Sequence, residues 1–162
     1  MNTTFNFSKV NDMVKAYGGK PRGLIINLTQ HQMVQEQYKY NDIELYEVQF
    51  KGHEKEARED ILEALTFNEI PTKEEIRNKA KTLATIAKAT LNQAENLSGI
   101  HARYYALIGG APYLMNALER ALKEEGVTPL YAFSKRVSVE TTQPDGSVIK
   151  TAKFVHEGYI EA

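Results

Sequence analysis

Cysteine is absent from the 162 residues of this chain. Its absence excludes disulfide bonds, thiolate metal sites and a cysteine nucleophile, and it suits a reducing compartment. Long apolar runs are also missing. None approaches the roughly 18 residues of a membrane-spanning helix, and the first residues lack the basic and apolar segments of a secretory signal. We therefore expect a cytoplasmic protein that does not associate with a membrane.

An excess of either charge is absent too. Lys and Arg total 20 against 21 for Asp and Glu, which gives a formal net charge of -1. This balance provides no basic field that would gather long duplex nucleic acid. A small anionic or nucleotide ligand remains compatible with it, because one or two local cations and a helix N-terminus suffice to bind a phosphate.

Metal-ligand spacing is the third absence. His53, His101 and His156 are isolated, and neither their mutual spacing nor the nearby carboxylates match a zinc site. We predict no metal and no cofactor.

The apolar pattern divides the chain into an N-terminal accessory helical segment, residues 1–20, and a single Rossmann-like α/β domain, residues 21–162. At the start of the domain, Gly23–Thr29 is apolar without alternation, as expected of a strand covered on both faces. Ile43–Phe50 alternates apolar and polar residues, which indicates a half-exposed strand nearer an edge.

Two helices are predicted next. Gly52–Phe67 carries apolar residues on one side of a helix, and a second helix begins after Pro71. Thr72 and Glu75 have the spacing of a capping box. Apolar residues then recur every three or four positions up to Ser98, which predicts the longest helix of the chain.

The remaining residues predict a strand-helix-strand unit followed by a hairpin. The unit consists of a strand over Tyr104–Ile108, a helix that begins at Pro112 and a strand over Pro129–Phe133, and the hairpin is formed by Val137–Thr142 and Val148–Val155. Together these elements predict a three-layer Rossmann-like sandwich around a mainly parallel sheet, with a C-terminal antiparallel hairpin. Ligands in such sheets bind beyond the carboxyl ends of the strands. We therefore expect Asn27–His31, Gly109–Pro112 and Ser134–Arg136 to meet at one edge.

Each of these three segments has a possible role in binding an anion. The Gly109-Gly110 pair precedes a helix N-terminus whose backbone N–H groups can receive an anion, and Ser134, Lys135 and Arg136 offer a hydroxyl and two cations to a phosphate. Asn27 and Thr29 are further ligand-binding candidates, and His31 is a candidate general base. The alternatives are a tight strand-to-helix turn for the glycines, a surface or capping role for His31, and solvated side chains for Lys135 and Arg136.

Several blocks of the sequence resemble a family of small uncharacterised bacterial and mobile-element α/β proteins. The blocks are Ile25–His31, Leu65–Pro71, Ile108–Met115 with Leu118-Glu119, and Pro129–Glu140, together with the Pro-Asp-Gly hairpin. The layout is also similar, more distantly, to the small CRISPR-associated Rossmann-fold (CARF-like) proteins, some of which bind or cut cyclic oligoadenylates. The chain departs from the first family after His31, at Gln32–Gln37, and in its added N-terminal segment.

Two hypotheses of function follow. In the first, the protein binds a nucleotide or another small anion, and it cleaves a cyclic oligonucleotide without a metal if His31 acts as a base. In the second, it is a non-catalytic interaction module that forms a homodimer through an exposed strand or the hairpin. The sequence alone does not decide whether the chain is an enzyme.

Overall fold

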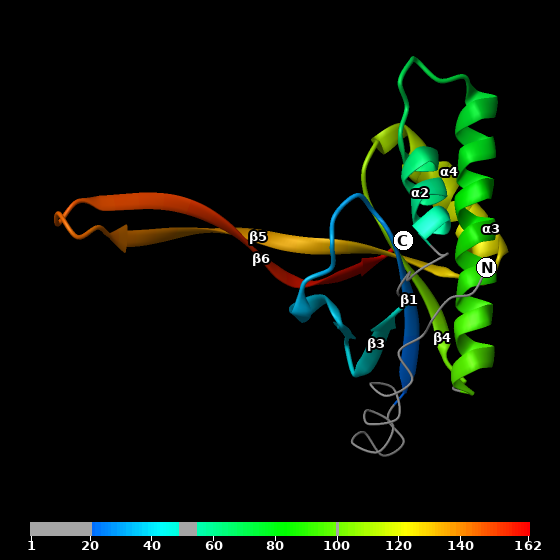
Figure 1. Cartoon of the computed structure of the whole chain (residues 1–162), viewed down its shortest axis with the longest axis horizontal. Helices are drawn as coiled ribbons and strands as arrows, with labels where there is room; N and C mark the ends of the chain where they lie inside the picture. The colour runs from blue at the N-terminus through cyan, green and yellow to red at the C-terminus, as the bar shows by residue number, and fades with distance from the viewer. Residues whose placement is uncertain (1–20, 49–54, 100) are drawn as a thin grey trace.

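The structure is a computed structural model that describes residues 21–48, 55–99 and 101–162. The predicted accessory segment at residues 1–20 lies outside the described residues, as do parts of the predicted Ile43–Phe50 strand and Gly52–Phe67 helix. Figure 1 shows the elements, which are in chain order β1 (Arg22–Leu28), η1 (Gln35–Gln37), β2 (Lys39–Tyr40), β3 (Ile43–Glu47), α2 (Lys55–Leu65), α3 (Lys73–Ser98), β4 (Arg103–Ile108), α4 (Pro112–Glu124), β5 (Thr128–Thr142) and β6 (Val148–Glu161).

The six strands form one mixed sheet in the order β2-β3-β1-β4-β5-β6. The four inner strands, β3, β1, β4 and β5, run parallel to one another. The outer strands β2 and β6 are antiparallel to their neighbours, and the antiparallel β5–β6 pair is the longest pairing in the sheet. The sheet is therefore mixed, because both of its outer strands are antiparallel and one of them forms the longest pairing. The prediction of a mainly parallel sheet was wrong.

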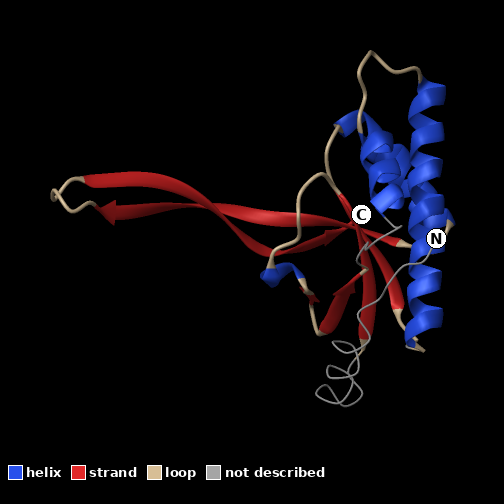
Figure 2. Ribbon diagram, in the orientation of Figure 1, coloured by secondary structure: helices blue, strands red, loops and turns tan. Residues whose placement is uncertain are grey.

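The first face of the sheet is covered by α2, α3 and α4, all on the same side (Figure 2). Leu24, Ile26 and Leu28 of β1 point into this layer and are fully buried. Helix α3 packs against it through small residues, among them Ala80, Ala84 and Ala87, which let the helix approach the sheet and its neighbours closely.

The second face has no α-helix over it in the described residues. Its apolar cluster is formed by strand residues, including Ile25, Leu45 and Tyr105, and it is covered by Met33, Tyr40 and Tyr159. The cover thus comes from the connection after β1 and from the two outer strands. This finding corrects the predicted three-layer sandwich: β1 is buried on both faces, as its sequence indicates, but irregular chain and curled strands supply the second cover.

The sheet curls so far that its two outer strands meet, which makes it nearly barrel-shaped. Tyr40 Oη on β2 donates to Glu161 Oε2 on β6 over 2.8 Å. The Tyr40 and Tyr159 rings pack edge to face with centroids 6.0 Å apart. These contacts bring together strands that are separated by the whole width of the sheet.

The outer part of β5 and β6 forms a long two-stranded arm that projects from the body of the protein (Figure 1). The predicted hairpin is present, but β5 runs without interruption from Thr128 to Thr142 instead of ending at Phe133. A register shift at Phe133/Ser134 marks the place where the strand leaves the body. From Ala132 to Thr142 every residue of β5 is exposed, so this stretch has no buried side to produce an alternating pattern.

The prediction of the longest helix is confirmed by α3. Thr72 Oγ1 accepts a hydrogen bond from the Glu75 backbone N–H over 3.1 Å, and Glu75 Oε2 accepts one from the Thr72 N–H over 2.6 Å. Gly99 ends the helix in the left-handed conformation, with φ of 65°. Among the described residues, no helix is long and apolar enough to cross a bilayer.

Candidate functional site

A cavity of about 540 Å³ opens beyond the carboxyl ends of β1 and β4, and we call it the rim cavity. Its volume is typical of small-molecule sites. It is lined by Thr29, Gln30, His31, Gln32 and Gln37 from the connection after β1, by Leu65, Thr66 and Phe67 at the end of α2, and by Leu107, Ile108, Gly109, Gly110, Ala111, Tyr113, Tyr131 and Ala132. Two of the three segments expected at this edge are therefore brought together.

After β1 and β4, the two strands whose carboxyl ends lie at the rim cavity, the chain continues in opposite directions. From β1 the chain continues toward β3 and covers the second face of the sheet, whereas from β4 it continues through α4 over the first face toward β5. Such a divergence between neighbouring parallel strands leaves a crevice at their carboxyl ends, where open α/β sheets bind their ligands.

The loop at Asn27–His31 is fixed by hydrogen bonds between its own residues. The buried Asn27 accepts from the Thr29 N–H over 2.9 Å and donates through Nδ2 to the His31 carbonyl over 2.6 Å. Thr29 Oγ1 lies 2.7 Å from Asn27 Oδ1. Asn27 therefore shapes the loop and does not line the cavity, whereas Thr29 and the exposed His31 do.

Arg58 of α2 supports this loop from outside, and sequence reasoning missed it. Its Nη1 donates to the Asn27 carbonyl over 2.8 Å and its Nη2 to the Thr29 carbonyl over 2.6 Å. Partial burial lowers the pKa of Arg58, and the Glu47 carboxylate opposes that shift. The sequence showed only one charge among several on a helix, with no signal that set it apart.

The Gly109-Gly110 turn forms the opposite side of the rim cavity. Gly110 has φ of 128°, a conformation that side-chain-bearing residues rarely adopt, so the turn needs glycine there. Ala111 precedes α4 and supplies no side-chain cap, so the first-turn N–H groups have no side-chain acceptor. The turn therefore presents backbone donors and the positive end of the α4 dipole to the cavity.

Aromatic rings form the outer wall. The Phe67 and Tyr113 rings pack edge to face with centroids 5.3 Å apart, and Lys79 Nζ lies 4.4 Å from the Phe67 centroid. Tyr131 Oη donates to Glu119 Oε1 over 2.6 Å. Burial, and then this carboxylate, raises the pKa of Tyr131. Tyr131 thus remains a neutral phenol, and all three aromatic residues line the cavity.

The third expected segment is not part of the rim cavity. Ser134, Lys135 and Arg136 lie on β5 beyond the register shift, at the base of the arm, and all three are exposed. The strand carries them past the edge where β1 and β4 end. In the described chain, no group of three or more His, Asp or Glu side chains gathers in a way that could hold a metal ion.

Comparison with known proteins gives one match. Residues 23–160 match the model of the uncharacterised protein MJ1673 family. No curated protein and no solved structure matches the chain. The match confirms that the chain resembles an uncharacterised protein family. It does not support the more distant resemblance to the CRISPR-associated Rossmann-fold proteins.

Proposed function

The chain belongs to the uncharacterised MJ1673 family, and from the geometry of the rim cavity we propose that it binds a nucleotide or a closely related small anionic ligand. The main support for the proposal is the position of the cavity. It lies at the carboxyl ends of β1 and β4, where the chain leaves these two neighbouring strands toward opposite faces of the sheet. The amide-rich Gly109-Gly110 turn would receive a phosphate, and the aromatic wall would hold a base.

The charge of the cavity lining limits the ligand. Among the described residues that line it, none is Lys, Arg, Asp or Glu, so uncharged groups and His31 must provide recognition. Backbone N–H groups and the side-chain amides of Gln30, Gln32 and Gln37 can bond to a phosphate and to the edge of a base. This donor set suits a ligand with one phosphate better than a triphosphate, whose several charges would require cations.

Thermal unfolding with a panel of nucleotides, including mononucleotides and cyclic oligoadenylates, tests the proposal. A ligand at about one hundred times its Kd adds about 2.7 kcal/mol of stability, which for a chain of this size raises Tm by about 5–10 °C. His31→Gln and Tyr113→Leu should reduce the shift, because both exposed side chains line the cavity. His101→Gln, at an exposed site outside the cavity, should leave it unchanged. If no nucleotide raises Tm, the proposal is wrong.

The proposal extends to cleavage through His31, the one imidazole among the described lining residues. As a general base it would take the proton of a ribose 2′-hydroxyl, whose oxygen attacks the adjacent phosphorus, while the 5′-oxygen leaves and is protonated. Chromatography of cyclic oligoadenylates incubated with the protein and EDTA would show linear products with a terminal 2′,3′-cyclic phosphate. His31→Gln should abolish these products while retaining part of the binding. An inactive wild-type protein would restrict the function to binding.

A second function, a non-catalytic module that forms a homodimer, is favoured by the arm. Register places Val137, Val139, Ile149 and Val155 on one face of the β5–β6 ribbon, and all four are at least 38% exposed. Lys135 and Lys153 lie on the same face, toward the base. Two arms crossed face to face in opposite directions would bury the apolar residues and keep the lysines of the two copies apart.

Light scattering across a range of protein concentrations tests dimerisation. Val139→Lys should shift the protein toward monomer, because it places a charge in the apolar face. Ser138→Lys, one residue away on the opposite face of the ribbon, is the matched control and should leave the mass unchanged. A wild-type monomer at every concentration would exclude this function.

A further inference from the structure

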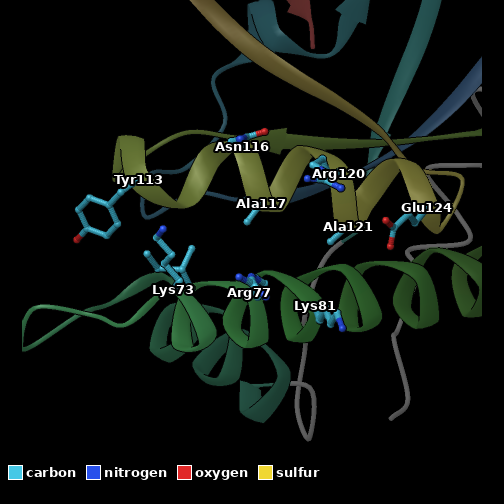
Figure 3. A pocket seen from close by; sticks show the side chains of 10 residues that line it. Lys73, Arg77, Lys81, Tyr113, Asn116, Ala117, Arg120, Ala121 and Glu124 are labelled. Atoms are coloured by element: carbon cyan, nitrogen blue, oxygen red, sulfur yellow. The ribbon is translucent and has the colours of Figure 1, made fainter.

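A second hollow, which we call the cationic groove, lies between α3 and α4 and has a volume of about 510 Å³ (Figure 3). Ile76, Ala117 and Ala121 form its apolar floor, and Asn116 and Tyr113 line it from α4. The groove is distinct from the rim cavity, because Tyr113 is the one residue shared by the two sets of described lining residues.

Four cations line this groove against one carboxylate. They are Lys73, Arg77 and Lys81 from α3 and Arg120 from α4, and the acidic residue is Glu124. All four cations are exposed. In the part of the chain that the structure describes, no acidic side chain forms an ion pair with any of them. The groove is thus strongly positive on a chain whose formal net charge is -1.

Two nearby carboxylates do not neutralise these cations, because they have other partners. Glu75 bonds to the Thr72 backbone at the start of α3, and Glu119 accepts from Tyr131 on the side of α4 that faces the sheet. Four cations against the single lining carboxylate of Glu124 therefore leave a net positive charge for a ligand.

The spacing of the cations indicates a ligand with repeated negative charges. Lys73, Arg77 and Lys81 follow one another at four-residue intervals along α3, so they form a row with steps of about 6 Å and a length of about 12 Å. One phosphate cannot contact both ends of this row. A chain of phosphates can.

Tyr113 connects the cationic groove to the rim cavity. It stands in the first turn of α4, lines both hollows and is 53% exposed. Its ring packs against Phe67 on the rim-cavity side. Stacking on an exposed aromatic ring is the usual way in which proteins hold an unpaired base.

We infer that the protein binds a short single-stranded nucleic acid, with its terminal nucleotide in the rim cavity, a base against Tyr113 and the following phosphates along the cationic groove. The inference rests on the proposed nucleotide-binding function and extends its ligand class from mononucleotides to linear oligonucleotides. The rim cavity recognises the end of the strand, and the groove supplies affinity through its phosphates.

Fluorescence anisotropy with a 3′-labelled linear oligoadenylate of about six nucleotides, together with thermal shift by AMP, tests the inference. The oligomer should bind at least tenfold more tightly than AMP, with a slope of log affinity against log salt of about -2 for three contacted phosphates. Arg77→Gln and Arg120→Gln should each weaken oligomer binding about tenfold and leave the AMP shift intact. Lys123→Gln removes a cation from α4 outside the groove and should change neither measurement.

The results separate this inference from the proposed function. If AMP binds but the oligomer binds no more tightly, or if both arginine variants bind it normally, the extension along the groove is wrong and mononucleotide binding stands. If the oligomer binds through the groove arginines but AMP gives no shift, the rim cavity does not hold the terminal adenylate and this inference is wrong, whereas the proposed function fails only if the other nucleotides of the panel give no shift either. If polyglutamate displaces the oligomer as effectively as unlabelled oligoadenylate does, the groove is a site for acidic peptides or polyanions in general, which overturns the assignment to nucleic acid.

Discussion

Arg58 Nη2 donates to the carbonyl oxygen of Thr29 over 2.6 Å and so ties helix α2 to the loop that lines the rim cavity. The same guanidinium donates to the carbonyl of Asn27, four residues before His31. A planar group with fixed, parallel donors holds two carbonyls of one loop in a defined orientation, whereas a lysine ammonium is a single point donor on a flexible stem. The position of Thr29 and His31 at the cavity thus depends on a side chain that does not line it.

Replacing Arg58 tests this dependence. Arg58→Ala should lower the free energy of unfolding by about 2 kcal/mol, because hydrogen bonds from a charged group contribute about 1.5–3 kcal/mol and two buried carbonyls would lose their donor. Arg58→Lys should have an intermediate effect. Urea unfolding measures both, with Glu59→Ala, at the next and exposed position of α2, as the control. Equal stabilities of Arg58→Ala and Glu59→Ala would show that the contact does not stabilise the fold.

Gly23 is required by close packing in the second apolar cluster. A Cβ atom at this position would lie 2.7 Å from Tyr105 Cε2 and 2.8 Å from Leu45 Cδ2. Gly23→Ala should therefore destabilise the protein by about 1–3 kcal/mol, as overpacking of a core usually does. Gly158→Ala on β6 is the matched control, since a Cβ atom there meets nothing within 4 Å. The urea midpoints of the two variants should differ clearly, and similar midpoints would contradict the prediction.

Tyr38 should make stability depend on pH in the alkaline range. Burial raises its pKa to about 12, and the Glu47 carboxylate, which accepts from Tyr38 Oη over 2.7 Å, adds to the shift. Because the folded state retains this proton more tightly than the unfolded state, the stabilisation is fully present below pH 10 and is lost as the pH rises toward 12. Tyr38→Phe should be less stable at neutral pH and should lose less stability over that alkaline range. Denaturant midpoints at a series of pH values measure the difference, and parallel curves would rule out the assignment.

The arm should contribute little to the stability of an isolated molecule. Nearly all of its side chains beyond the register shift are exposed, and a two-stranded ribbon alone is only marginally stable. Replacing residues 136–154 with a short Asn-Gly turn should leave the urea midpoint of the monomer almost unchanged, while any dimer would be lost. A large fall in the midpoint of a protein that is monomeric before the deletion would show that the arm supports the body of the fold.

Local interactions explain which elements the sequence predicted well. Helix α3 was predicted because its capping box and its apolar repeat lie within a few residues of one another. The Gly109-Gly110 turn was predicted for the same reason, and Gly110 does adopt a positive φ. Strand β1 was correctly predicted to be covered on both faces, although its sequence carried no information on what covers it.

Contacts between distant residues account for the errors. Arg58 meets Asn27 across 31 positions, and no local pattern marks such a pair. Strand β5 was predicted to end at Phe133 because Ser134, Lys135 and Arg136 are polar, yet polar residues also suit a ribbon exposed on both faces. As a consequence Arg136 lies on β5 and not among the described residues that line the rim cavity with His31. The cations of α3 and α4 that line the cationic groove carried no signal in the sequence that set them apart from other charges on helices.

The contact between Tyr40 and Glu161 has a consequence for folding kinetics. The two residues are 121 positions apart, so joining them closes a very long loop, and such non-local contacts form late. Until they form, neither outer strand is covered by the side chains of the other, and each is more accessible to pairing with another chain. Aggregation during refolding should therefore arise from the unclosed intermediate, and dilute refolding should suppress it.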